Sequence, residues 1–174
     1  SNTPKQIVVY NALNLPIPKF YHVAMIHNES GKKLSKRDGA TDVMQYKEDG
    51  FLPEALLNFL VRLGWSHGDQ EIFTIDEMIK LFDPKNINRS ASVYNTDKLL
   101  WLNGHYINTM DQEELEERLK EKELDISALD KKELLINLTK EKARTINDLA
   151  NAMKNILDRP KEYQAKSIKK IGRT

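Results

Sequence analysis

Residues 51–65, F-L-P-E-A-L-L-N-F-L-V-R-L-G-W, carry a well-marked helix signal. Apolar residues recur at positions 52, 56, 59, 60 and 63, which is the spacing of one helix face. Pro53 stands at the start, and Gly64 stands just past the last apolar residue, so both helix ends are marked. The segment therefore predicts an amphipathic helix that packs one face into a core.

Further helices are predicted on the C-terminal side, because the chain repeats one start signal. A capping residue is followed three positions later by an acid at Thr74 with Glu77, Asp111 with Glu114, Asp130 with Glu133, and, more weakly, Thr145 with Asp148. Such pairs satisfy free N–H groups at a helix start. The last helix should span 146–157, with an apolar side made of Ile146, Leu149, Ala150, Met153, Ile156 and Leu157.

The N-terminal side shows a different sequence pattern. Residues 3–13 read as a helix with Thr3 as its N-cap and Pro4 at its first position. Residues 20–26, F-Y-H-V-A-M-I, are almost continuously apolar, as in a strand buried on both faces of a parallel sheet. A short buried helix is the competing interpretation. The sequence pattern changes again near residues 108–111, and only helices are predicted after this point.

Composition excludes several classes of protein. The chain of 174 residues is 40% hydrophobic and 30% charged, which is typical of a soluble globular protein. It contains no cysteine, so a disulfide framework, a thiolate metal site and a cysteine nucleophile are excluded. No apolar run approaches the ~20 residues of a membrane helix, and the start does not resemble a secretory signal. We expect a cytoplasmic protein.

The net charge of +1 hides an uneven distribution. Residues 1–110 are balanced, residues 111–138 carry 5 basic and 10 acidic side chains, and residues 139–174 carry 10 basic and 4 acidic ones. A basic segment of this kind can bind phosphates by displacing their counterions. It can equally be an ordinary solvated helix face, and charge alone favours that interpretation.

Residues 28–39, N-E-S-G-K-K-L-S-K-R-D-G, are polar and without period, and they predict a loop. Within it, residues 32–37 place four cations among six residues. Ammonium groups on a loop suit a triphosphate, because they can neutralise charge that moves during reaction. A solvated loop, a localisation signal and a general nucleic-acid patch stay open as alternatives.

Residues 33–37, K-L-S-K-R, resemble the K-M-S-K-S signature of class I aminoacyl-tRNA synthetases, in the form found in glutamyl-tRNA synthetases. Residues 1–6 resemble the S-N-T-P-R-Q segment of that family, and residues 53–65 its P-E-A-L-x-N-x-L-x-x-L-G-W block. Residues 90–107 are similar to its S-x-A-x-F-D-x-x-K-L-x-W-x-N-x-x-Y-I block. Tyr94-Asn95 departs from the usual Phe-Asp, and Arg37 stands where other class I enzymes have serine.

The resemblance implies a mainly α fold in three parts. Residues 1–40 would be the C-terminal remnant of a Rossmann-like catalytic domain, with a helix, a parallel-type strand and the signature loop. Residues 41–108 would be a mixed, mostly helical stem-contact region. Residues 109–174 would be part of a helical-bundle anticodon-binding region.

The resemblance also implies a reaction. Members of the family activate glutamate with ATP, in the presence of Mg²⁺, and transfer it to tRNA(Glu). Lys36 matches the second lysine of the signature and would bind the leaving pyrophosphate, with Lys33 and Ser35 supporting it as further catalytic residues. Lys36 and Lys33 would thereby bind ATP. The backbone of Met25 would border the adenine, while its side chain is expected in the core.

Contacts to tRNA are expected at Arg37, Arg89, Lys142 and Arg144. Residues 142–146 are similar to the R-x-K-T-L run of the anticodon-binding region. Asn58, Trp65 and Trp101 lie on or beside apolar helices, and we expect all three to pack in the core. No metal site is expected in this chain, and the resemblance suggests a monomer.

The H-I-G-H segment and the glutamate-binding residues of the family have no counterpart here, so we expect a C-terminal part of a synthetase that is inactive alone. One alternative is a stand-alone RNA-binding or scaffold module derived from a synthetase. A second is a fragment of a glutaminyl-tRNA synthetase. That family has β-barrel anticodon domains, whereas this C-terminal third is patterned for helices.

Overall fold

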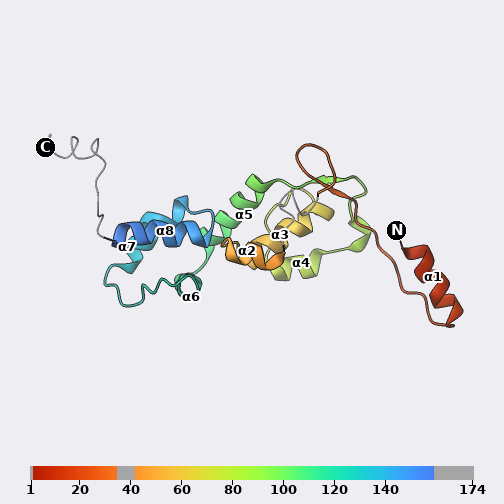
Figure 1. Ribbon diagram of the computed structural model, residues 1–174, viewed down its shortest axis with the longest axis horizontal. Helices are drawn as coiled ribbons and strands as arrows, with labels where there is room; N and C mark the ends of the chain where they lie inside the picture. The colour runs from red at the N-terminus through yellow and green to blue at the C-terminus, as the bar shows by residue number, and fades with distance from the viewer. Residues whose placement is uncertain (1, 35–41, 159–174) are drawn as a thin grey trace. The chain divides into compact units, whose positions relative to one another are not determined.

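The computed structural model describes residues 2–34 and 42–158 (Figure 1). The chain divides into two compact units. Unit 1 comprises Ser1–Leu34 and Val61–Tyr94, and unit 2 comprises Ser35–Leu60 and Asn95–Thr174. Helix α3, Pro53–Gly64, confirms the helix predicted from residues 51–65. It contributes residues to both units.

Unit 1 contains few regular elements and a small core. Its elements are α1 (Thr3–Ala12), β1 (Ile26–His27), α4 (Ile75–Leu81), the 3₁₀ helix η2 (Pro84–Asn86) and β2 (Ser92–Val93). The two strands pair in parallel, with Ile26 opposite Ser92. Helix α1 buries none of its residues among the described part of the chain. Its N-cap is Asn2 and not Thr3 as predicted, because the helix already includes Thr3.

The predicted strand over residues 20–26 is wrong in its extent and its burial. Only its last residue, Ile26, belongs to β1, and residues 20–25 have no regular structure. Met25 is half exposed, so its side chain is not in the core as expected. A strand is buried on both faces only where neighbouring strands and helices cover it. Among the described residues, β1 has a single parallel partner of two residues.

The core of unit 1 forms around Trp65, which is 1% exposed and confirms the predicted packing role of this residue. Its indole contacts the rings of Phe73 and Phe82, with centroids 5.6 and 5.7 Å apart. Met78, on α4, completes this cluster. The cluster ties α4 to the C-terminal end of α3.

Helix α4 begins with the predicted capping box. The Thr74 hydroxyl accepts a hydrogen bond from the Glu77 N–H, and the Glu77 carboxylate accepts one from the Thr74 N–H at 2.8 Å. These hydrogen bonds, the backbone one first, lower the pKa of Glu77 below its ordinary value of 4.5. A depressed pKa means that the charged carboxylate stabilises the folded state. This stabilisation is complete above the unfolded pKa and is lost as the pH falls through the folded pKa.

We therefore expect Glu77→Gln to destabilise unit 1 at pH 7, and we expect the difference from the parent to shrink as the pH falls below about 4.5. Glutamine can still accept the Thr74 N–H bond, so the substitution isolates the charge. Urea unfolding followed by Trp65 fluorescence, in a Trp101→Phe background, measures the difference. A difference in the free energy of unfolding that stays constant from pH 7 to pH 3 would contradict a stabilising role for the Glu77 charge.

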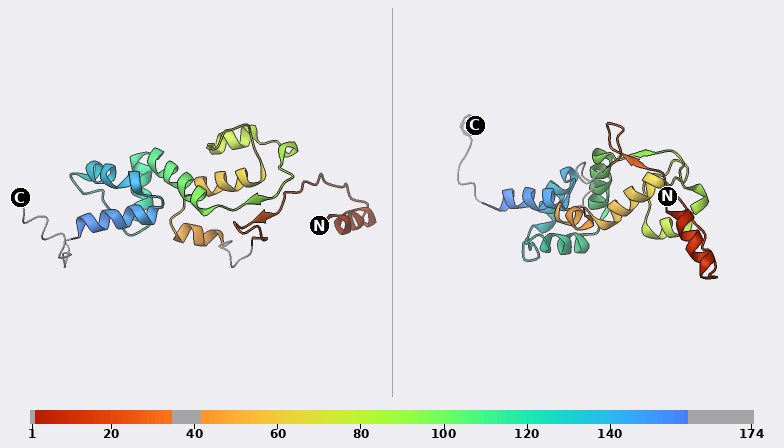
Figure 2. Two further views of the ribbon diagram at one scale, coloured as in Figure 1. Left: turned by 90° about the horizontal axis from the view of Figure 1, so that it is seen from above. Right: turned by 45° about the vertical axis from the view of Figure 1, so that its right-hand side comes forward.

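All the regular elements in the described part of unit 2 are helices. It contains α2 (Val43–Glu48), α5 (Thr96–Thr109), α6 (Gln112–Lys120), α7 (Lys132–Thr139), the 3₁₀ helix η3 (Lys140–Lys142) and α8 (Ile146–Leu157). Helices α7 and α8 pack side by side (Figure 2). The core is a continuous apolar cluster in which Leu115, Leu119 and Leu149 are almost fully buried. None of the helices in residues 2–34 and 42–158 is both long and apolar enough to cross a bilayer.

The helix starts of unit 2 follow the predicted caps with one exception. Asp111 caps α6 through the Glu114 N–H, and Thr145 with Asp148 forms a full capping box on α8. The prediction for Asp130 is wrong, because α7 begins after Lys131, which makes no side-chain cap. A turn in which the Lys132 N–H bonds the Leu129 carbonyl displaces the start of the helix.

The apolar side predicted for residues 146–157 is only partly buried. Ile146, Leu149, Ala150 and Met153 lie in the core, whereas Ile156 and Leu157 are exposed. Spacing predicts which residues share a face, but burial needs a partner along the whole length of that face. The described part of unit 2 supplies that partner only for the first two-thirds of α8.

Two buried asparagines join the segments of unit 2. Asn58 is fully buried, as expected, and its side-chain oxygen accepts a hydrogen bond from the Tyr106 hydroxyl at 2.9 Å. Asn103 is also fully buried and links two backbone groups. Its oxygen accepts from the Leu52 N–H at 2.7 Å, and its NH₂ donates to the Arg144 carbonyl at 2.6 Å.

Candidate functional site

The residues that lead into the K-L-S-K-R motif form a tight turn after β1. The Asn28 N–H donates to the Lys32 carbonyl at 2.8 Å, and the Asn28 side-chain oxygen accepts from the Lys32 N–H at 3.0 Å. Gly31 adopts a φ of +76°, the left-handed region that favours glycine. The local sequence N-E-S-G therefore closes the turn by itself.

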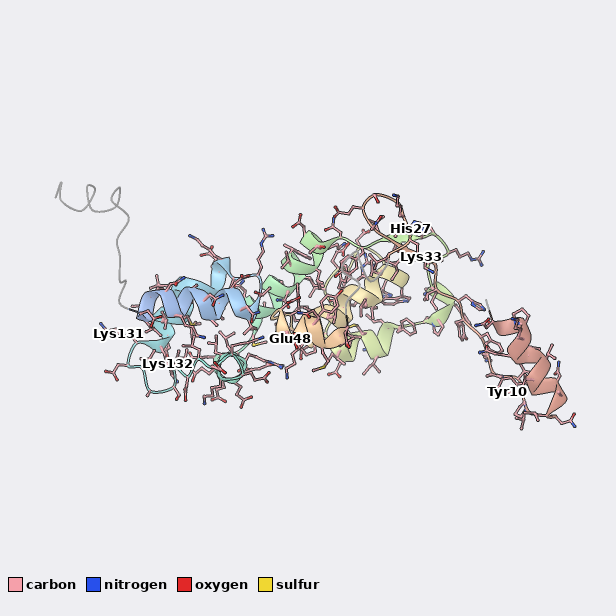
Figure 3. All side chains as sticks on the ribbon, in the orientation of Figure 1. Tyr10, His27, Lys33, Glu48, Lys131 and Lys132 are labelled. Carbon is pink, nitrogen blue, oxygen red and sulfur yellow. The ribbon has the colours of Figure 1, made fainter. Side chains whose placement is uncertain are left out.

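Lys33 leaves this turn in a defined position. It pairs with His27 in an antiparallel bridge, and the Leu34 N–H donates to the Ile26 carbonyl at 2.9 Å. Figure 3 labels His27 and Lys33 close together at this turn. The Lys33 side chain is exposed. The structure thus presents the first lysine of the motif to solvent from a turn anchored on β1.

The remaining motif residues, Ser35, Lys36 and Arg37, lie outside the described residues. Their assigned roles as pyrophosphate, ATP and tRNA contacts stay predictions. Met25 belongs to the described part, and its carbonyl accepts a hydrogen bond from the Ser92 N–H at 3.3 Å. The predicted contact of the Met25 backbone with adenine also stays a prediction.

A second candidate site lies within unit 2, between α5 and the segment that joins η3 to α8. We call it the aromatic–basic groove, a depression of about 480 Å³. Its lining residues are Leu100, Trp101, Gly104, His105, Asn108, Glu141, Lys142, Ala143 and Arg144. Two of the predicted tRNA contacts, Lys142 and Arg144, therefore come together in one groove.

Trp101 corrects the prediction that it packs in the core. Its side chain is 51% exposed and lines the groove. The buried residues of α5 include Leu99, Leu102, Asn103 and Ile107. Residues 101, 105 and 108 follow one another at spacings of four and three, so they occupy a different face of the helix. This periodicity is the signal that could have identified Trp101 and His105 as surface residues.

Close packing of the backbone shapes the floor of the groove. A Cβ atom at Gly104 would lie 3.3 Å from the Ala143 carbonyl oxygen, tighter than most such contacts, so glycine permits this approach. The Asn103 side chain donates a hydrogen bond to the Arg144 carbonyl and so holds the backbone of this segment in place. The Arg144 guanidinium reaches Asp97 only at 4.0 Å, and both side chains are largely exposed. An exposed pair of this kind contributes little and leaves the guanidinium available to a ligand.

The chemistry of the groove suits a nucleic acid. An exposed indole offers a stacking surface for a base, and arginine and lysine neutralise phosphates. Arg89 is exposed but belongs to unit 1, so the structure does not place it with the groove. Within residues 2–34 and 42–158 there is no group of three or more His, Asp or Glu side chains that could hold a metal ion.

The comparisons with known proteins agree with the motif blocks. Residues 1–101 match the family described as "tRNA synthetases class I (E and Q), catalytic domain". The chain belongs to this class I synthetase family. The match covers β1, the turn before the motif and the part of α5 that ends at Trp101.

The relatives of this class I synthetase chain are glutamate–tRNA ligases. It is 68% identical over 169 residues to glutamate–tRNA ligase 1 of Sulfurovum sp. and 64% identical to glutamate–tRNA ligase 2 of Nitratiruptor sp.. These matches cover 97% of the chain but only 37% of each relative. The chain thus spans little more than a third of the length of these curated relatives.

A solved structure shows the same fold. The crystal structure of a glutamate tRNA ligase from Elizabethkingia meningosepticum, in complex with its amino acid, has a TM-score of 0.79 to this class I synthetase chain at 31% identity. The likeness covers 97% of this chain and 39% of that one. The mainly α fold inferred from the resemblance is therefore confirmed.

Proposed function

We propose that the chain is the part of a glutamate–tRNA ligase that supplies the pyrophosphate-binding motif and a tRNA-binding surface. The reaction of the intact protein would join glutamate to tRNA(Glu) with ATP and Mg²⁺, in the cytoplasm. Support comes from the similarity to glutamate–tRNA ligases along nearly the whole chain. The single structural observation that carries the RNA-binding part is the aromatic–basic groove.

Three of the lining residues have distinct tasks in this proposal. Trp101 stacks on a base or a ribose, while Arg144 and Lys142 neutralise phosphates of the same RNA segment. The remaining residues of the motif, together with Lys33, bind the phosphates of ATP. Charge at that motif stabilises the pyrophosphate that leaves when glutamate attacks the α-phosphate.

Binding of tRNA(Glu) to the 174-residue chain tests the groove. We expect Trp101→Ala to weaken binding about tenfold, because stacking on one base contributes ~1–3 kcal/mol. We expect Arg144→Ala to weaken binding and to reduce the slope of log K against log salt by about one, because one phosphate contact is lost. Fluorescence anisotropy of a labelled transcript over a series of salt concentrations measures both quantities.

Matched controls are available at Leu138 on α7 and at Lys131 just before this helix. Leu138 is exposed, and Lys131, labelled in Figure 3, lines a different depression from the aromatic–basic groove. Leu138→Ala and Lys131→Ala should leave tRNA binding within about twofold of the parent, a change comparable with the small effects of ordinary surface substitutions. If Trp101→Ala and Leu138→Ala weaken binding equally, the groove is not the RNA site.

The stand-alone RNA-binding module remains the second candidate function, and the exposed groove supports it as well. The two differ in the intact protein. A ligase requires Lys36 for adenylate formation, whereas an RNA-binding module has no such requirement. Detection of a natural protein that binds tRNA through this groove without ATP–pyrophosphate exchange would favour the module.

A further inference from the structure

Helix α2 depends on distant residues of unit 2 for its position. It has six residues, Val43–Glu48, and none of them is buried. Val43 and Met44 expose most of their side chains. A helix of this length has little stability of its own, because most helical stability in proteins comes from packing. The Tyr46 ring packs edge-on against Phe51, and hydrogen bonds at the C-terminal end of the helix add to this contact.

The hydrogen bonds at this end of α2 come from the turn that follows α6 and from the first turn of α8. The Lys122 ammonium donates to the carbonyls of Lys47 and Glu48, each at 3.0 Å. The Asn147 side chain donates to the Glu48 carbonyl at 2.8 Å. Figure 3 labels Glu48 at this end of α2. We call these donors, with the Ile146 N–H described next, the α2 cap.

The backbone completes the α2 cap just past the helix. The Ile146 N–H, at the start of α8, donates to the Gly50 carbonyl at 2.9 Å. Gly50 has a φ of +87°, and a Cβ atom there would lie 2.7 Å from the backbone nitrogen of Asn147. Only glycine allows α8 to begin this close to the chain that leaves α2. The cap donors pair the Glu48 carbonyl and add a second donor to the Lys47 carbonyl, which also accepts from the Gly50 N–H.

The α2 cap and the aromatic–basic groove share one short segment. Arg144 lines the groove, and Ile146 and Asn147, which belong to the cap, follow it two and three residues later. Between them, the Thr145–Asp148 capping box fixes the backbone, with the Arg144 N–H also donating to Asp148 at 3.2 Å. A ligand that orders the Arg144 side chain therefore acts on the same backbone that holds α2.

We propose that Lys122 and Asn147 are positioning residues that hold the C-terminal end of α2, and that RNA bound in the aromatic–basic groove tightens this hold. The RNA part rests on the proposed function. Coupling between two sites is reciprocal, so a tighter α2 must also favour RNA binding. Helix α2 begins six residues after Arg37 in the sequence. The cap thus links the RNA-binding surface to the helix that follows the motif.

Hydrogen exchange followed by NMR on the 174-residue chain tests the hold without RNA. The probes are the N–H groups of Asp49, Gly50 and Phe51, which donate to carbonyls of α2. We expect Lys122→Met and Asn147→Ala to speed exchange of these amides about fivefold to tenfold, at the low end of the range of coupling effects in proteins. Amides of α4, such as that of Met78, should not change.

Two further variants distinguish loss of the Lys122 hydrogen bonds to α2 from a general loss of stability. Lys122→Arg retains a donor that reaches two carbonyls, so it should restore the parent exchange rates. Lys120→Met removes an exposed lysine two residues away and should leave the rates unchanged. Unchanged rates in both Lys122→Met and Asn147→Ala, or equal acceleration of all amides, would overturn the proposed hold.

Addition of saturating tRNA(Glu) tests the coupling. In the parent we expect slower exchange of the same amides, and in Lys122→Met we expect tRNA binding to weaken by the factor by which RNA slows exchange in the parent. If tRNA binds the parent but leaves these amides unchanged, the coupling is wrong and the proposed function stands. If tRNA does not bind the parent, the RNA-binding part of the proposed function fails and the coupling falls with it.

Discussion

Replacing Lys36 by alanine in an intact ligase that contains this sequence should slow ATP–pyrophosphate exchange by about 100-fold or more. The reason is electrostatic, because loss of one well-placed donor to charge that develops in a transition state commonly costs ~3 kcal/mol. Binding of tRNA should weaken far less, since one cation among many contributes a single phosphate contact. Exchange of labelled pyrophosphate into ATP and tRNA binding, both measured on the same preparation, give the comparison.

The control for this prediction is Lys80→Ala. Lys80 is exposed in the last turn of α4 and lies outside the motif. We expect the Lys80 variant to retain the parent rate of exchange. Equal losses of exchange and of tRNA binding in Lys36→Ala would show that the lysine contacts RNA and not the departing pyrophosphate.

Asn103→Ala should destabilise unit 2 by about 2 to 4 kcal/mol, because it leaves one buried N–H and one partly buried carbonyl unpaired. The Leu52 N–H loses its acceptor and the Arg144 carbonyl loses its donor. Each such group costs roughly 1–3 kcal/mol when it stays buried without a partner. Urea unfolding followed by far-ultraviolet circular dichroism measures the loss.

Two variants make this prediction sharp. Asn155→Ala is the same substitution at an exposed position of α8, and it should change the stability by less than about 0.5 kcal/mol. Asn103→Asp keeps an acceptor for the Leu52 N–H but buries a charge. Its stability should recover partly as the pH falls and the carboxylate takes up a proton. An Asn103→Ala variant as stable as the Asn155 variant would show that water replaces both bonds.

The two predictions depend on different kinds of knowledge. The role of Lys36 follows from the motif and the resemblance alone, since this residue lies outside the described part of the chain. The role of Asn103 is visible only in the structure, because its partners are 51 and 41 residues away in the sequence. Spacing of four residues from Leu99 and Ile107 places this asparagine on the buried face of α5, but it does not identify its partners.

Local sequence was sufficient wherever the deciding interactions lie within one helical turn. Thr74, Asp111 and Thr145 cap their helices as expected, because a cap needs only a side chain and an N–H three residues later. The helix at Pro53–Gly64 and the turn before the motif are predictable for the same reason. The motif blocks likewise indicated the family before any coordinates.

Tertiary structure decided how far each apolar or aromatic residue is buried. Trp65, just past the end of α3, fills a core with Phe73, whereas Trp101, within α5, lines a groove. The run at residues 20–25 shows the same limit, because it is apolar but forms no strand with any neighbour within residues 2–34 and 42–158. Burial is a property of the segments that meet in space, and those segments are far apart along the chain.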